Sequence, residues 1–407
     1  YEYKVIDNKP AITAQLNYSD DDGKAISARV VSYRVVANGE AIIAKTVKTD
    51  ANGNIYIDIK NDKPENLRGA YIQTTIEADS KLKITKNFAI KAGFLQSDVQ
   101  FFPEGGVLIN GVASRIGFKA LGMDGKGILI KGSIIDEQGN NVADFESEHA
   151  GMGTFKLKPE EGKTYTAKVK YPDGSESTIA LPKAENTGFV LAVYQPNRDS
   201  ILVRVNLSPV AATPVNVSLI AQTGGETIYA TPLNNTKSMT SIWLLKKDFP
   251  TGIAQFTLFN ESGEPLNERV AFIKNKDQMK LEISTAKQSY KSRENVSVGL
   301  QSFNSKGKPV AGSFSVTVVN EDKVPLDESN EHTILSSTLL TSDIKGYVEQ
   351  PNYYFTAENE SVNKALDNLM LTQGYRRFTW KEVSSGLSVK PKFIAEKFIG
   401  CAYRDIQ

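Results

Sequence analysis

One pattern recurs along this chain: an alternating strand, a polar turn that ends in Gly-Lys, and a second alternating strand. Three copies are found, over residues 12–35, 115–135 and 296–319. Apolar and polar residues that alternate with a period of two are typical of antiparallel sheets with one buried face. The turn glycines are Gly23, Gly125 and Gly307, at spacings of 102 and 182 residues. The pattern therefore predicts an all-β chain of tandem antiparallel sandwiches that repeat at roughly 100 residues.

Chain length supports several domains, because 407 residues exceed the roughly 250–300 at which a single core stops growing. A more divergent unit near 200–220 carries Pro214 in place of the Gly-Lys turn and fills the longer spacing. We expect four sandwiches, the last with a helical insertion, and the start of a further segment. Their expected bounds are 1–93, 94–185, 186–276, 277–390 and 391–407.

One segment departs from the β pattern. Residues 360–373 place apolar side chains on one face at helical spacing: Val362, Leu366, Leu369, Met370, with Gln373 beside them. Gly374 is the expected C-terminal stop of this helix, and residues 375–380 are expected to return as a strand to the fourth domain. We expect the apolar stripe to pack against a sandwich rather than to form a binding face.

Composition excludes several classes of protein. Net charge is +1, and lysine and arginine are dispersed among acidic residues, so no nucleic-acid partner is expected. No run of about 18 apolar residues is present, so no transmembrane segment is expected in this chain. Cys401 is the only cysteine, which excludes an internal disulfide framework and a cysteine-based zinc site.

No motif for catalysis is found: the chain has no His-Glu-x-x-His, no Gly-x-Ser-x-Gly and no P-loop. Five features could suggest a site and are interpreted as structural. They are His149 in a glycine-flanked turn, His332 in an acidic segment, the hairpin tip 20–23, the tight strand-initiating turn Gly105-Gly106, and the half-solvated pair Arg376-Arg377. We therefore expect no catalytic, cofactor-binding or metal-binding residues, no cofactor, and no enzymatic activity.

Three segments resemble macroglobulin-domain proteins of Bacteroidota outer membranes, and they occur in that family's order. They are VQFFPEGG (99–106), FESEHAGMGTFKLKPEEGKTYTAKV (145–169) and NLMLTQGYRRFTW (368–380). The resemblance implies a row of seven-stranded, fibronectin-like sandwiches in an exported protein, located in the periplasm or at the cell surface. Family members commonly continue into a TonB-dependent receptor plug. We expect an export signal before Tyr1 in the precursor. The family's usual N-terminal domain is not evident, which indicates an internal piece or a divergent member.

The favoured function is therefore a non-enzymatic binding or scaffolding protein of the cell envelope, associated with the outer membrane. Its expected partner is an outer-membrane protein such as a TonB-dependent transporter. One alternative is an accessory glycan- or peptide-binding module of a secreted hydrolase, with the aromatic run 353–355 as its platform. Another is a protease trap with a bait loop near 236–244, although Cys401 precedes Ala402-Tyr403-Arg404 and lacks the thioester motif of such traps.

Overall fold

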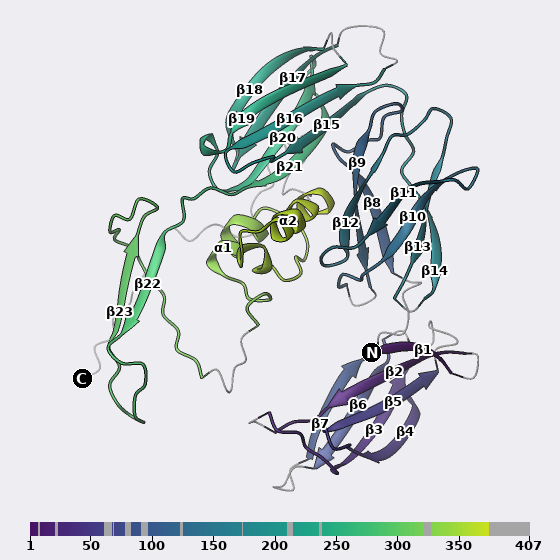
Figure 1. The fold of residues 1–407 in the computed structure, drawn as a ribbon, viewed down its shortest axis with the longest axis vertical. Helices are drawn as coiled ribbons and strands as arrows, with labels where there is room; N and C mark the ends of the chain where they lie inside the picture. The colour runs from purple at the N-terminus through teal and green to yellow at the C-terminus, as the bar shows by residue number, and fades with distance from the viewer. Residues whose placement is uncertain are drawn as a thin grey trace.

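The computed structural model shows three antiparallel β-sandwiches, a separate two-stranded sheet and a short helical region (Figure 1). It describes residues 1–6, 9–20, 23–60, 67, 69–77, 83–90, 97–122, 125–172, 174–209, 215–235, 238–320 and 327–373. The all-β sandwich fold predicted from the alternating pattern is confirmed.

Each sandwich contains seven strands. The first has β1 (Glu2–Ile6), β2 (Lys9–Asn17), β3 (Val30–Ala37), β4 (Glu40–Lys48), β5 (Asn54–Lys60), β6 (Tyr71–Glu77) and β7 (Lys83–Ala89). The second has β8 (Asp98–Pro103), β9 (Ser114–Leu121), β10 (Lys131–Asp136), β11 (Asn141–Glu146), β12 (Met152–Leu157), β13 (Tyr165–Lys170) and β14 (Glu176–Ala180). The third has β15 (Phe189–Tyr194), β16 (Ser200–Leu207), β17 (Val215–Thr223), β18 (Glu226–Asn235), β19 (Met239–Leu245), β20 (Gly252–Asn260) and β21 (Pro265–Ile273).

All three sandwiches share one topology. Strands one, two and five form a three-stranded sheet: β1-β2-β5, then β12-β9-β8, then β15-β16-β19. The other four strands form the facing sheet, in the orders β4-β3-β6-β7, β11-β10-β13-β14 and β18-β17-β20-β21. Each sandwich has its own core of alternate side chains from both sheets. Identical topology in three units shows that the sequence repeat reflects a structural repeat.

The Gly-Lys turns have the same geometry in all three copies. In the first, Gly23 N–H donates to the Asp20 carbonyl, and Asp20 N–H donates to the Lys24 carbonyl. The same two bonds recur around Gly125 and Gly307. An isolated β-bridge pairs the residues on either side of each turn: Ser19 with Ala25, Leu121 with Gly127, and Phe303 with Pro309. Each glycine has a positive φ, which is why glycine recurs at this position.

The described residues after 276 do not form a complete fourth sandwich. They contain the paired strands β22 (Lys280–Thr285) and β23 (Val298–Phe303) and four short or medium helices. The helices are α1 (Ile334–Ser336), the π-helical turn η3 (Ser337–Thr341), the 3-10 turn η4 (Tyr353–Phe355) and α2 (Glu360–Thr372); a further 3-10 turn, η2 (Lys246–Asp248), lies in the third sandwich. The sandwich bounds inferred from the sequence stay predictions.

Candidate functional site

Helix α2 lies between the second and third sandwiches (Figure 1) and contacts β21, β12, β9 and β8. Its N-terminus is capped by Asn359, whose Oδ1 accepts a hydrogen bond from the Val362 N–H at 2.9 Å. The predicted helix and its buried stripe are confirmed: the side chains that are buried include Val362, Leu366, Leu369, Met370 and Gln373. Its apolar stripe packs against the second and third sandwiches and against the rest of the helical region, and its assignment to a fourth domain stays a prediction.

One apolar cluster joins the second sandwich, the third sandwich and the helical region. The second sandwich contributes Met152, the third contributes Ile253, Val270 and Phe272, and the helical region contributes Leu340, Ile344, Val348, Tyr354, Ala365, Leu366, Leu369 and Met370. Burying side chains of this size is worth about 1.5–3 kcal/mol each. The cluster therefore holds residues far apart in the chain as one unit, which we call the junction.

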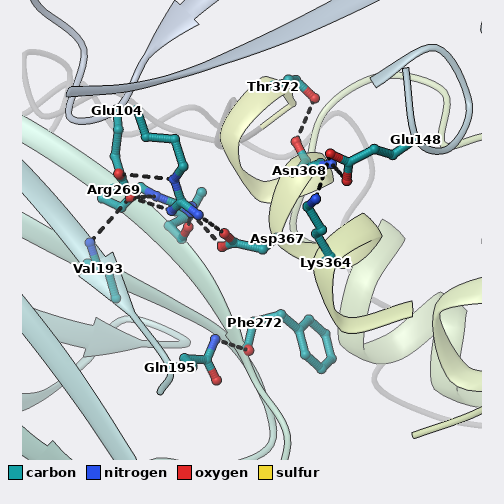
Figure 2. Close-up of polar contacts among 12 residues, drawn as sticks. Glu104, Glu148, Val193, Gln195, Arg269, Phe272, Lys364, Asp367, Asn368 and Thr372 are labelled. Carbon is teal, nitrogen blue, oxygen red and sulfur yellow. Dashed lines mark hydrogen bonds and ion pairs between the residues drawn. The ribbon is translucent and has the colours of Figure 1, made fainter. Parts of the chain in front are cut away.

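Four charged side chains cross the junction (Figure 2). Glu104, in the turn after β8, accepts from Arg115 of β9 through both oxygens, at 2.7 and 3.2 Å. Its Oε1 also accepts from Arg269 Nε of β21 at 2.9 Å. Asp367 of α2 accepts from Arg115 Nη1 at 2.7 Å and from Arg269 Nη2 at 2.5 Å. Two carboxylates and two guanidinium groups thus form one balanced cluster.

The cluster is largely buried, and burying charges costs free energy unless they are paired. The side chains of Glu104 and Arg269 are 1% and 2% exposed, and that of Asp367 is 26% exposed. Burial alone would raise the pKa of the Asp367 carboxyl, but Arg269 and Arg115 outweigh it and hold that pKa below its usual value. Burial also acts to lower the pKa of Arg115, and the Asp367 and Glu104 carboxylates more than reverse this. Each carboxylate contacts both guanidinium groups, so removing any one member would leave an uncompensated charge in the buried cluster.

A second polar group fixes the other side of α2. Glu148, before β12, accepts from Asn368 Nδ2 at 3.0 Å and pairs with Lys364 Nζ at 2.9 Å (Figure 2). One turn further along, Thr372 Oγ1 lies 3.1 Å from the Met152 sulfur and donates to the Asn368 carbonyl at 2.8 Å. Positions 364, 368 and 372 lie on one helix face because they are four residues apart.

Alternate side chains of β9 contact helix α2 along its length. Arg115 binds Asp367, and Lys119 Nζ donates to Gln373 Oε1 at 2.6 Å. Between them, a Cβ on Gly117 would lie 3.2 Å from side-chain atoms of Leu371 and Thr372. The small residue at 117 therefore allows the helix to lie close to the strand.

The two sandwiches also contact each other directly. Asn267 Nδ2 of β21 donates to the Gly105 carbonyl at 3.0 Å and to the Phe189 carbonyl at 2.8 Å. A Cβ on Gly105, whose φ is +82°, would lie 2.8 Å from the Leu191 carbonyl oxygen. Gly105-Gly106 is thus a tight turn, as predicted, although it follows strand β8 instead of initiating a strand.

A cavity of about 270 Å³ opens beside the junction. Its walls come from β9, β12, the 345–349 loop, η4 and the end of α2: Lys119, Leu121, Gly125, Ala150, Met152, Lys345, Gly346, Tyr347, Glu349, Tyr354, Leu369 and Gln373. Gln373 Nε2 donates to the Tyr347 carbonyl at 2.8 Å, and Glu349 Oε2 accepts from the Gly127 N–H at 2.7 Å. These bonds tie the loop to both the helix and the second sandwich.

His149 packs against the aromatic run at 353–355, of which Tyr354 belongs to the junction. The His149 ring stacks on Tyr353 with centroids 3.8 Å apart, and burial lowers the pKa of His149 despite the opposing Glu349 carboxylate. Tyr354 is fully buried, and Phe355 packs edge-on against Phe272. The suggestion that this run forms an exposed aromatic platform is therefore wrong.

The prediction of a bait loop near 236–244 is also wrong for most of its length. Residues 239–245 form β19, which pairs with β16 along its whole length.

The other residues considered as sites have ordinary surroundings or lie outside the described residues. Asp20 Oδ1 accepts from the Lys24 N–H at 2.8 Å, as a hairpin-tip residue does. His332 is exposed. Residues 21–22, 236–237, Gly374, the expected strand 375–380 with Arg376-Arg377, Cys401 and the segment 391–407 lie outside the described residues.

Among the residues described, no group of three or more His, Cys, Asp and Glu side chains is arranged to hold a metal ion. In the same part of the chain, no helix combines the length and the apolar character needed to cross a membrane. The expectation that the chain has no catalytic or cofactor-binding residue stays a prediction.

Comparison with known proteins gives distant similarity alone. No family model matches the chain, and no curated protein matches it. Native alpha-2-macroglobulin of Escherichia coli is 13% identical, with 73% of this chain and 22% of that chain covered and a TM-score of 0.21. The tetra-tandem repeat from the extending region of a large adhesion protein is 11% identical, with 74% and 85% covered and a TM-score of 0.21. Dimeric latent PorU from Porphyromonas gingivalis is 12% identical, with 67% and 32% covered and a TM-score of 0.27. TM-scores this low support no conclusion about function.

Proposed function

We propose that this chain is a non-enzymatic binding and scaffolding protein of the cell envelope. The observation that carries the proposal is the buried cluster of Glu104, Arg115, Arg269 and Asp367, which joins two sandwiches and a helix. A charge cluster placed at a domain boundary fixes the relative orientation of the domains that share it, because separating them would leave the buried Arg269 without Glu104 and Asp367. A fixed row of sandwiches presents its loops and edge strands at set distances, which suits a scaffold.

The envelope location rests on the resemblance of segments 99–106, 145–169 and 368–380 to exported macroglobulin-domain proteins. The same resemblance suggests an outer-membrane partner, with a TonB-dependent transporter as the leading candidate. Recognition would use exposed strand edges and loops, a mode that needs no catalytic group.

The test is fractionation and affinity purification of the full-length protein from native membranes after crosslinking. We expect recovery with the outer membrane and a TonB-dependent transporter among the crosslinked chains. Recovery in the cytosolic fraction would contradict the location. Turnover of a glycan, ester or peptide that a single substitution abolishes would contradict the non-enzymatic role.

A further inference from the structure

Strand β19 (Met239–Leu245) is an outermost strand of the sheet β15-β16-β19 in the third sandwich (Figure 1). It pairs with β16 in continuous register, and no other described strand pairs with its outer edge. An outermost strand presents a row of backbone N–H and C=O groups, which is a template for pairing with another chain. The outer edge of β19 is therefore a place where a further strand can add.

The sequence of β19 lacks the features that usually prevent such pairing. Sheets protect their edges with charged residues, proline, bulges or a covering element. In the three sandwiches, every outermost strand carries a charged residue or a proline except β15 and β19. Strand β15 is covered, since five of its six residues are buried. Strand β19 (MTSIWLL) has no register shift against β16, and four of its seven residues are exposed.

The outward face of β19 is mostly apolar. Leu244 packs in the core of the third sandwich, and residues at alternate positions of a strand face opposite sides. The outward residues are Met239, Ser241, Trp243 and Leu245, of which the three apolar ones are, in that order, 49%, 60% and 46% exposed. A strand added at this edge could therefore pack apolar side chains against those of β19.

The charges around β19 are mainly positive. Residues 236–249 contain three lysines and one acidic residue, Asp248. Arg204 of β16 pairs with Ser241 of β19, and directly paired residues of neighbouring strands face the same side of a sheet. Arg204 thus adds a cation to the outward face, and an incoming strand with acidic residues would be attracted to it.

The same charges act against a second copy of this chain as the occupant. Two copies of β19 paired antiparallel about Ile242 would place Lys237 of one copy opposite Lys247 of the other. Like charges directly opposite each other destabilise a strand pair. Charge complementarity therefore favours an acidic partner over self-association.

We propose that the outer edge of β19 binds an extended, acidic segment of a partner protein as an additional strand. Main-chain hydrogen bonds to the edge supply affinity, and contacts with Met239 and Trp243 select apolar side chains at alternate positions of the segment. The inference rests on the proposed binding function and deepens it, because it names the surface and the chemistry of the partner.

The experiment is photo-crosslinking of the full-length protein in the cells that produce it. The crosslinking residue p-benzoylphenylalanine replaces Met239, and mass spectrometry identifies the crosslinked segment. The matched control carries it in place of Tyr56, which is 56% exposed on β5, the strand of the first sandwich that corresponds to β19 and that contains Asp58 and Lys60. We expect position 239 to crosslink to a segment with alternating apolar residues and acidic ones, at a yield about fivefold or more above that of position 56.

Two variants at the neighbouring outward position test the charge. In the protein that carries the crosslinker at 239, Ser241→Glu should lower the yield about fivefold or more, and Ser241→Lys should leave it unchanged or raise it. Thermal unfolding checks that each variant is folded. A crosslink to a second copy, a crosslink to a segment without acidic residues, or equal yields from the two Ser241 variants would overturn the proposal.

The failure of this inference and the failure of the proposed function give different results. If position 239 gives no crosslink while lysine-reactive crosslinking of the same membranes recovers a partner, the β19 inference is wrong and the proposed function stands. If neither method recovers a partner, the proposed binding function itself is contradicted.

Discussion

The second sandwich and the segment from 280 to 320 begin alike and end differently. Both start with two paired strands, β8–β9 and β22–β23, and both continue into the same Gly-Lys turn. After the turn the second sandwich forms β10, in which Ile134 is fully buried. After β23, described residues 309–320 form no strand, although Phe314, Val316 and Val318 alternate as in a strand; Val316 is 67% exposed.

The difference shows that the turn depends on contacts within a few residues, whereas burial of the strands depends on distant parts of the chain. The turn forms in both places because its glycine and its two hydrogen bonds lie within a few residues. Burial of the strands needs a facing sheet, and after residue 327 the chain runs to the junction instead. Among the described residues, Leu281, Ile283 and Leu300 on β22–β23 therefore stay exposed, while Ser302, which pairs with Leu281, is buried.

The largest expected effect contrasts a buried charge with an exposed one. Arg269→Met should lower the free energy of unfolding by about 3–5 kcal/mol, because Glu104 and Asp367 each lose a buried partner. Lys280→Met removes the cation of the exposed Lys280–Glu282 pair on β22 and should cost less than about 1 kcal/mol. Urea unfolding of both variants measures the difference, and similar losses would remove the distinction between the two regions.

Truncation of one apolar side chain in each region gives the next effect. Leu369 is 1% exposed in the junction, so Leu369→Ala should cost about 2–5 kcal/mol. Ile283 is 67% exposed on β22, so Ile283→Ala should change stability by no more than about 0.5 kcal/mol. Thermal or urea unfolding reports both. A large loss from Ile283→Ala would show that the exposed face of β22–β23 is covered in solution.

The third prediction uses pH. Since the folded-state pKa of Asp367 is lowered, its pairing stabilises the protein fully above the unfolded-state pKa near 3.9. That stabilisation is lost as pH falls through the lower folded-state pKa, at about 1.4 kcal/mol for each unit of difference. Asp367→Asn should therefore destabilise the protein clearly at pH 7 and less at pH 3 in urea unfolding. An equal cost at both values would mean that the charge of Asp367 is unimportant.

The smallest effect concerns the spacing of strand and helix. Gly117→Ala places a Cβ 3.2 Å from Leu371 and Thr372, so one of them must shift. We expect a loss of about 1 kcal/mol, typical of modest overpacking. Hydrogen exchange should show faster exchange along α2 and unchanged exchange in β22–β23, which is remote from this contact. Faster exchange in β22–β23 instead would link the two regions.

Much of the fold could be predicted from sequence because it depends on local patterns. Alternation gave the strands, the Gly-Lys turns gave the repeat, and the spacing of Leu366, Leu369 and Met370 gave the helix with its buried face. Which sandwich the helix covers could not be inferred. An apolar stripe predicts that one face of a helix is buried, but it does not identify the surface that covers this face.

The charged junction was missed for a related reason. Arg269 directly precedes the apolar run Val270-Ala271-Phe272-Ile273 of β21, and Asp367 directly follows Leu366 of the apolar stripe of α2. Charged residues in such positions are rare unless they are paired, so each was a signal that a partner exists. The partner could not be identified, because Arg115 and Asp367 are 252 residues apart.

That separation sets an order in which the protein can be completed during synthesis. Domains emerge and fold from the N-terminus onward, so Glu104, Arg115 and Arg269 meet before residue 367 exists. Until then two guanidinium groups share one carboxylate, and the apolar surface that α2 will cover faces water. A chain that stops short of Asp367 would hold its second and third sandwiches together weakly. The last described helix therefore completes the junction only after at least 367 residues have been synthesised.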